Sequence, residues 1–116
     1  MNDKNIIVSG GAGFIGSNLC AMLVDRGDSV LCLDNLITGS EKNIAPLLSR
    51  PNFKFINFDV CKSIDTRMHG AIDEIYHLAS PADPNTKSPY SYMAHPFETM
   101  EVNTSATWKL CEFALK

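Results

Sequence analysis

Four short apolar runs interrupt the otherwise mixed sequence. They cover residues 6–8, 30–33, 53–58 and 75–79. The first, second and fourth runs are almost continuously apolar, which is typical of parallel strands covered on both faces. The third, "FKFINF", alternates with polar residues and favours a position nearer a sheet edge. We therefore predict four strands.

The stretch between the first two runs has the spacing of a helix. Ile15, Leu19, Met22 and Leu23 recur at helical intervals, and Gly27 follows them as a natural C-cap. A strand, a helix and a second strand within about 30 residues form a β-α-β unit, whose strands run parallel.

Other segments are less regular. Residues 99–115 predict a long second helix through Met100, Ala106 and Leu110, and residues 40–50 predict a short one limited by Pro46. Residues 61–72 carry no clear pattern. Residues 81–96 hold four of the six prolines and predict a stiff loop, which either faces a substrate or is a mobile surface excursion.

Length and charge narrow the function classes. A chain of 116 residues fits one domain, so we treat residues 1–116 as a unit. The net charge of -3 and the lack of a Lys/Arg cluster argue against nucleic acid or an anionic membrane as partners. No segment has the length and apolarity of a leader or a membrane span, so we expect a cytoplasmic protein.

The cysteines and histidines do not form a metal or redox motif. The four cysteines contain no C-x-x-C pair, and the three histidines have no i, i+4 spacing. We expect buried free thiols and no metal site.

The stretch "NIIVSGGAGFIGSNL" has the composition of a phosphate-binding turn. Gly10, Gly13 and Gly16 stand three residues apart, and they can supply a sharp turn, a close approach to a ligand and a helix packed against the sheet, in that order. The helix start then offers free N–H groups to a phosphate. A P-loop is excluded because Ser17 and Asn18 stand where Lys and Ser/Thr would be needed.

Asp34 closes the second predicted strand, 18 residues after Gly16. A carboxylate there can accept hydrogen bonds from both ribose hydroxyls and repels a 2′-phosphate, so it favours NAD over NADP. The alternative is an Asp that caps a turn. Dinucleotides lie at the carboxyl ends of the strands where strand order reverses, which here is between the first and fourth strands.

The sequence resembles the extended short-chain dehydrogenase/reductase family, the NAD-dependent nucleotide-sugar epimerases and dehydratases. The motif T-G-x-x-G-x-x-G stands here as "SGGAGFIG", and "DNLITG", "FDV", "YHLAS" and "NTSAT" follow it. The combination of "HLASPA" with "DNLITG" is most similar to UDP-glucuronate decarboxylases. The resemblance implies an α/β fold, a Rossmann-type doubly wound parallel sheet with strand order 3-2-1-4, incomplete in this chain.

The resemblance also implies the cofactor NAD and a set of positions around it. The residues implied around the pyrophosphate are Gly10, Gly13, Phe14, Ile15 and Gly16. Those implied around the adenosine ribose are Asp34, Asn35, Thr38 and Gly39. Asp59 and Val60 would border the adenine, and Leu78, Ala79 and Ser80 would line the path toward the nicotinamide.

The catalytic residues of the resembled family do not occur in these 116 residues. Its chemistry needs a Tyr-x-x-x-Lys pair, and none of the three tyrosines has a lysine four residues later. We expect the chain to be the front part of the fold, which binds NAD weakly and catalyses nothing, with a nucleotide sugar as substrate of the whole enzyme. The alternative is a standalone nucleotide-binding module with a regulatory or scaffolding role.

The predicted order leaves the outer edge of the fourth strand without a neighbour. An unpaired strand edge is a template for pairing. We therefore expect pairing with another chain, as in a homo-oligomer, unless the sequence is a piece of a longer protein.

Overall fold

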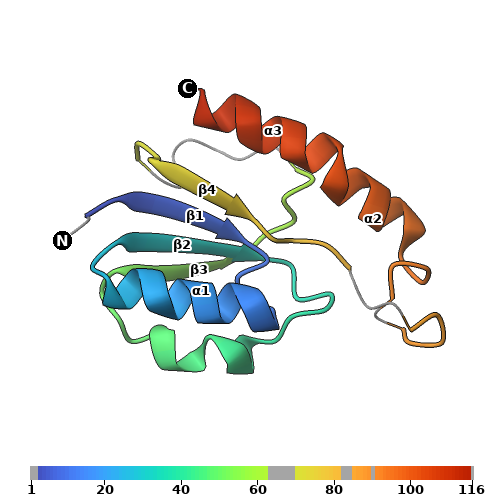
Figure 1. The fold of residues 1–116 in the computed structure, drawn as a ribbon, viewed down its shortest axis with the longest axis horizontal. Coiled ribbons are helices and arrows are strands. Elements are labelled where there is room, and N and C mark those ends of the chain that lie inside the picture. Colours follow the sequence, from blue (N-terminus) through green and yellow to red (C-terminus); the bar gives the residue numbers. More distant parts are fainter. Residues whose placement is uncertain (1–2, 63–69, 82–84, 90, 116) are drawn as a thin grey trace.

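A four-stranded parallel sheet forms the centre of the computed structural model, which describes residues 3–62, 70–81, 85–89 and 91–115. The strands are β1 (Asn5–Ser9), β2 (Ser29–Asp34), β3 (Phe53–Asn57) and β4 (Glu74–His77). Their order is β3-β2-β1-β4, and every pairing is parallel. Figure 1 shows this arrangement, which confirms the predicted fold class and strand order.

Helices complete the described part of the chain. They are α1 (Phe14–Asp25), α2 (Pro96–Asn103) and α3 (Ser105–Ala114), with two 3-10 turns, η1 (Glu41–Asn43) and η2 (Ala45–Leu47), where a short helix was predicted. Just after α1, Gly27 has φ of 101°, a conformation that suits glycine and ends the helix as predicted.

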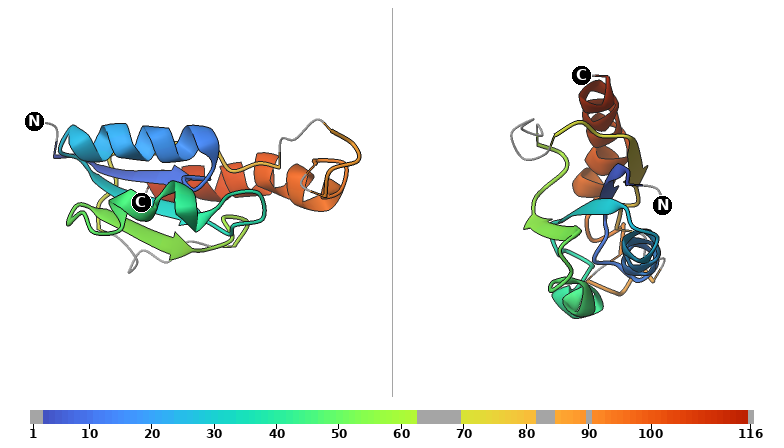
Figure 2. Two further views of the ribbon diagram at one scale, coloured as in Figure 1. Left: turned by 90° about the horizontal axis from the view of Figure 1, so that it is seen from below. Right: turned by 90° about the vertical axis from the view of Figure 1, so that its left-hand side faces the viewer.

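Two apolar layers cover the two faces of the sheet. Because side chains alternate along a strand, Ile6 and Val8 of β1 pack with α1 and the 3-10 turns, whereas Ile7 packs with α2 and α3. The two turned views in Figure 2 show helices on both faces. This packing buries β1 and β2 completely, apart from their first residues.

The two edge strands differ from the central pair. β3 is at one edge, as the alternation of "FKFINF" indicated, and β4 is at the other. All four residues of β4 are half-buried, so the expectation that it is covered like β1 was wrong within the described part of the chain. Pairing of its outer edge with another chain stays a prediction.

The predicted C-terminal helix is broken into α2 and α3. Thr104 lies between them with φ of -124° and ψ of -79°, outside helical geometry. Helix α2 also begins earlier than the predicted residue 99. Proline is tolerated at the first helical position, and Pro96 takes that place. In α2 the buried apolar residue is Val102, while Met100 is 67% exposed.

The buried face of α1 was also misassigned. The spacing of Ile15 and Met22 predicted a core face, but these side chains are 72% and 69% exposed. The small residues Gly16, Ser17 and Cys20 face the sheet, together with Leu23 and Val24. Apolar periodicity missed this face because close helix–sheet packing here uses residues with little side chain.

Two predicted segments fall partly outside the described residues. The connection 61–72 lacks residues 63–69, and the proline-rich loop 81–96 lacks residues 82–84 and 90. In the part of the chain that is described, no helix is both long enough and apolar enough to cross a membrane.

An ion pair between a buried carboxylate, that of Asp28, and the half-exposed Arg26 lies at the amino ends of the strands. The Asp28 side chain is 0% exposed, accepts a hydrogen bond from the Lys4 backbone N–H at 3.0 Å and pairs with Arg26 at 2.6 Å. Burial raises the pKa of Asp28, but the Lys4 amide and the Arg26 guanidinium outweigh it and leave this pKa below its usual value.

We predict that Asp28→Asn makes the free energy of unfolding fall less steeply as the pH is lowered. A depressed carboxyl pKa contributes stability above the unfolded-state pKa and loses it as the pH falls through the folded-state pKa. Urea unfolding between about pH 6 and pH 2 should therefore show a smaller fall in the variant than in wild type. Asp25→Asn, which removes a carboxylate from an exposed pair with Arg50, is the control for the change in net charge. Equal slopes for all three proteins would contradict this role of Asp28.

Candidate functional site

The turn after β1 is shaped by glycines that meet different steric demands. Gly10 has φ of 73°, and a Cβ there would lie 2.7 Å from the backbone of Leu78 and Ala79. A Cβ at Gly16 would lie 2.2 Å from the Gly10 carbonyl oxygen, so α1 can approach the turn only without a side chain at this position. A Cβ at Gly13 would meet only that same oxygen, at 3.4 Å. Gly10 and Gly16 are therefore required by the fold, whereas Gly13 is not.

The first turn of α1 presents unsatisfied donors. Gly13 is the N-cap, with no side-chain capping bond and no acidic residue in the first turn. The first backbone N–H that bonds back is that of Ser17, to the Gly13 carbonyl at 2.9 Å. The N–H groups of Phe14, Ile15 and Gly16 have no acceptor among the described residues. Together with the helix dipole, they form a site suited to an anion.

Asp34 at the end of β2 holds the backbone around it. Its Oδ2 accepts from the Ala12 N–H at 3.0 Å and its Oδ1 accepts from the Leu36 N–H at 2.8 Å. The side chain thus links the glycine-rich turn to the loop after β2, in which Leu36 has a positive φ of 64°. The capping alternative considered for Asp34 is realised. A carboxylate has about four lone-pair sites, so Asp34 keeps sites that can accept hydrogen bonds from ribose hydroxyls.

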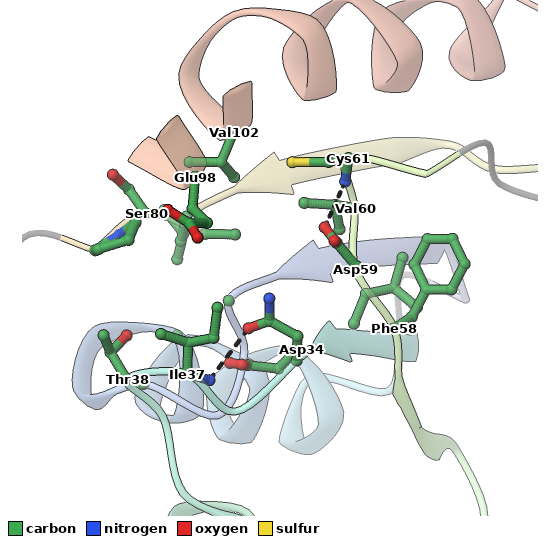
Figure 3. A pocket seen from close by; sticks show the side chains of 18 of the residues that line it. Asp34, Ile37, Thr38, Phe58, Asp59, Val60, Cys61, Ser80, Glu98 and Val102 are labelled. Carbon is green, nitrogen blue, oxygen red and sulfur yellow. Dashed lines mark hydrogen bonds between the residues drawn. The ribbon is translucent and has the colours of Figure 1, made fainter. Parts of the chain in front are cut away.

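A cleft of about 610 Å³ opens at the carboxyl ends of the strands. Thirteen of the fourteen positions expected around a dinucleotide line it, and Gly39 is the exception. A Cβ on Gly39 would lie 3.0 Å from Ala12 and Asp34, so this residue supports the cleft wall from behind. Figure 3 shows three groups of lining side chains, which come from the loop after β2, the loop after β3, and the β4 end with α2.

Sequence reasoning missed several residues that line the cleft. They are Leu33, Ile37, Phe58, Cys61, Pro81, Glu98, Glu101 and Val102. Glu98, Glu101 and Val102 share one face of α2, at i, i+3 and i+4. The sequence signal for this face of α2 was Pro96, because proline favours the first position of a helix. A helix that starts at Pro96, not at residue 99, includes Glu98 and places all three residues beside the strand ends.

The cleft is acidic. Asp34, Asp59, Glu98 and Glu101 line it, and no Lys, Arg or His does so within the described ranges. A bound phosphate would therefore depend on backbone N–H groups and on the helix dipole. The Cys61 thiol also lines the cleft, and burial, with nearby Asp59 adding to it, raises its pKa to about 12. Cys61 is a thiol at neutral pH and is not suited to act as a nucleophile.

A family model matches almost the whole chain. The model described as the NAD dependent epimerase/dehydratase family covers residues 6–116. The chain belongs to the NAD-dependent epimerase/dehydratase family. This confirms the family resemblance that was based on the glycine motif and the segments after it.

The relatives are consistent with this family. The chain is 40% identical over 109 residues to UDP-glucuronic acid decarboxylase 1 of Arabidopsis thaliana, an overlap of 94% of this chain and 23% of the relative. It is similar to the crystal structure of Pal from Bacillus thuringiensis, with a TM-score of 0.76, 29% identity and coverage of 96% and 35% of the two chains.

A third similar protein is an enzyme whose structure was solved in complex with NAD+. WbmF of Bordetella bronchiseptica in complex with NAD+ has a TM-score of 0.73 and 29% identity, with coverage of 95% of this chain and 32% of that chain. The chain thus spans between 23% and 35% of the length of these three relatives.

We predict that Gly16→Ala destabilises the fold. The added Cβ would collide with the Gly10 carbonyl, and such overpacking typically lowers the free energy of unfolding by about 1 to 3 kcal/mol. Gly70→Ala is the matched control, because a Cβ there has no neighbour within 4 Å and should change stability by less than about 0.5 kcal/mol. Urea unfolding measures both. Equal stability of the two variants would disprove the close contact.

We also predict that Asp34→Ala destabilises the chain in the absence of any ligand. It leaves the Ala12 and Leu36 N–H groups without their acceptor, which should lower the free energy of unfolding by about 1 to 3 kcal/mol. Asp25→Ala removes an exposed carboxylate and should cost less than about 1 kcal/mol. If the two variants are equally stable by urea unfolding, the carboxylate of Asp34 does not hold the turn.

Proposed function

We propose that this chain binds NAD in the cleft, as the cofactor-binding part of an enzyme that acts on a nucleotide sugar. The observation that carries the proposal is the set of free N–H groups at the start of α1, beside Gly13, where the fold itself would tolerate a side chain. With no cationic side chain among the described lining residues, this helix start is the feature of the cleft best suited to a pyrophosphate.

The remaining contacts follow the cleft outward from the helix start. The adenosine ribose would lie on Asp34, Asn35 and Thr38, in front of Gly39. The residues that would surround the pyrophosphate are Gly10, Gly13, Phe14, Ile15 and Gly16. The adenine would lie against the loop that contains Asp59 and Val60, and the nicotinamide toward residues 78–80. Apart from Gly39, these positions line one continuous cleft, which supports the placement of one extended ligand along it.

Asp34 would also select between the two common dinucleotides. Its oxygens hold two backbone N–H groups and keep lone pairs for ribose hydroxyls. A 2′-phosphate at the same place would bring negative charge against the carboxylate, which like-charge repulsion disfavours. The proposal is therefore NAD and not NADP.

Bound NAD would supply reversible hydride transfer, so that a sugar hydroxyl is oxidised transiently to a keto group. The 116 residues provide the binding walls, but they contain no Tyr-x-x-x-Lys pair to take the hydroxyl proton. We propose that these residues alone bind NAD and do not catalyse. The decarboxylase relatives, together with a structure of WbmF with NAD+ and UDP, favour a UDP-sugar as substrate of the whole enzyme.

The decisive variant is Gly13→Ala. Its Cβ fits the fold, at 3.4 Å from the Gly10 oxygen, but it would stand where the pyrophosphate should approach the backbone. We predict unchanged stability and an NAD affinity about tenfold to a hundredfold lower, since charge-assisted hydrogen bonds to the phosphate would lengthen. Calorimetric titration with NAD measures the affinity, and urea unfolding measures the stability.

Two comparisons make that titration interpretable. Gly70→Ala, outside the cleft, should bind NAD like wild type, and NADP should bind wild type at least about tenfold more weakly than NAD. A wild-type chain with no measurable NAD binding would refute the proposed function. Wild-type affinity in Gly13→Ala would refute the assignment of the pyrophosphate to this turn.

A further inference from the structure

A chain of hydrogen bonds beside the cleft joins the end of β1, the segment that follows β4, and helix α2. Ser9 and His77 are the last residues of β1 and β4, and they are partners in the sheet register. The Ser9 Oγ lies 2.6 Å from the His77 Nδ1. On the other side of the ring, the His77 Nε2 lies 2.8 Å from the carbonyl oxygen of Val102 in α2.

The same hydroxyl also binds the segment that follows β4. The Ser9 Oγ accepts hydrogen bonds from the backbone N–H groups of Leu78 at 3.1 Å and Ala79 at 3.3 Å. Both residues line the cleft, as does Val102. Ser9 itself is 0% exposed, so water cannot replace these bonds.

Only one arrangement of hydrogens satisfies every group in this chain. The Val102 carbonyl can only accept, so the His77 Nε2 must carry a hydrogen. In a neutral imidazole the Nδ1 is then an acceptor, and the Ser9 hydroxyl donates to it. The Ser9 oxygen is left with its lone pairs for the two N–H groups of Leu78 and Ala79. The network therefore assigns a single tautomer to His77.

The Val102 carbonyl lies next to the break in the helix. Regular helical geometry ends two residues later, at Thr104, where the chain turns from α2 into α3. Figure 1 shows α2 and α3 following one another along the sheet edge that carries β4. The ring of His77 is thus a polar link between β4 and α2, the helix that carries Glu98 and Val102 into the cleft. A second link is the hydrogen bond from the Asn103 side chain in α2 to the Ser80 hydroxyl at 3.1 Å.

We propose that His77 is a positioning residue, which sets the distance between α2 and the glycine-rich turn and so fits the cleft to a dinucleotide. The inference rests on the proposed function, because it assumes that the cleft binds NAD. His77 does not line this cleft, so its effect on the ligand would be exerted through Ser9 and Val102.

The test compares substitutions at His77 with the same substitution at another histidine. His77→Phe keeps an aromatic ring, somewhat larger than imidazole, and removes both hydrogen bonds. His95→Phe is the matched control, since the His95 Nε2 also lies 2.8 Å from a backbone carbonyl, that of Pro89, but the residue is outside the cleft. We expect His77→Phe to lower NAD affinity about tenfold and His95→Phe to leave it unchanged.

Two conservative variants separate the two halves of the network. The side-chain amide of Gln can place an N–H donor near the position of Nε2, whereas the Asn oxygen can replace the acceptor Nδ1 only. His77→Gln should therefore restore affinity to within about threefold of wild type, and His77→Asn should resemble His77→Phe. A role in general stability alone would not rank Gln above Asn in NAD affinity once both variants are folded.

Two further readouts do not depend on the ligand, and the first of them needs no variant. In wild type, nitrogen NMR should show His77 protonated at Nε2 and not at Nδ1, and the opposite tautomer would overturn the network. Amide exchange in residues 97–103 should be faster in His77→Phe than in wild type.

The outcomes separate this inference from the proposed function. A wild-type chain that binds no NAD would refute the proposed function itself. Wild-type binding together with unchanged affinity in His77→Phe would refute only the role of His77. Reduced affinity in His77→Phe, rescue by Gln and the Nε2 tautomer would together support it.

Discussion

The contact between the first turn of α1 and the Gly10 carbonyl constrains the rest of the site. A single added carbon at Gly16 would lie 2.2 Å from that oxygen, so the helix start and the turn after β1 touch backbone to backbone. This contact directs the free N–H groups of residues 14–16 toward the carboxyl ends of the strands. The donors of the anion site are therefore backbone N–H groups held by packing, with no cationic side chain among the described residues that line the cleft.

Asp34 extends this constraint to the neighbouring strand. By accepting from Ala12 and Leu36, it fixes the turn after β1 relative to the loop after β2. The observed structural role and the proposed ribose contact fall on one side chain, which means that loss of NAD binding on replacing Asp34 would not by itself identify a ribose contact. Gly13 separates the two roles, because the fold tolerates a Cβ there while the proposed ligand position does not.

The parts of the structure that were predictable from sequence are those with a short-range physical cause. Continuous apolar runs identified β1 and β2, and the glycine spacing identified the turn, because backbone sterics leave few alternatives. The buried face of α1 was not predictable from apolar spacing, because close packing selects small residues there. The break at Thr104 has no proline or glycine to mark it, and the contacts of His77 depend on residues 25 and 68 positions away.

The acidic lining of the cleft explains why such long-range positioning would matter. A site with lysine or arginine can follow a displaced phosphate with a flexible side chain, whereas backbone N–H groups cannot move without the helix that carries them. In the described part of this cleft the polar lining is acidic or neutral, so complementarity to an anionic dinucleotide depends on the spacing of its walls. The buried Ser9 hydroxyl and the ring of His77 join those walls where β1 and β4 end, next to the turn whose shape Gly10 determines.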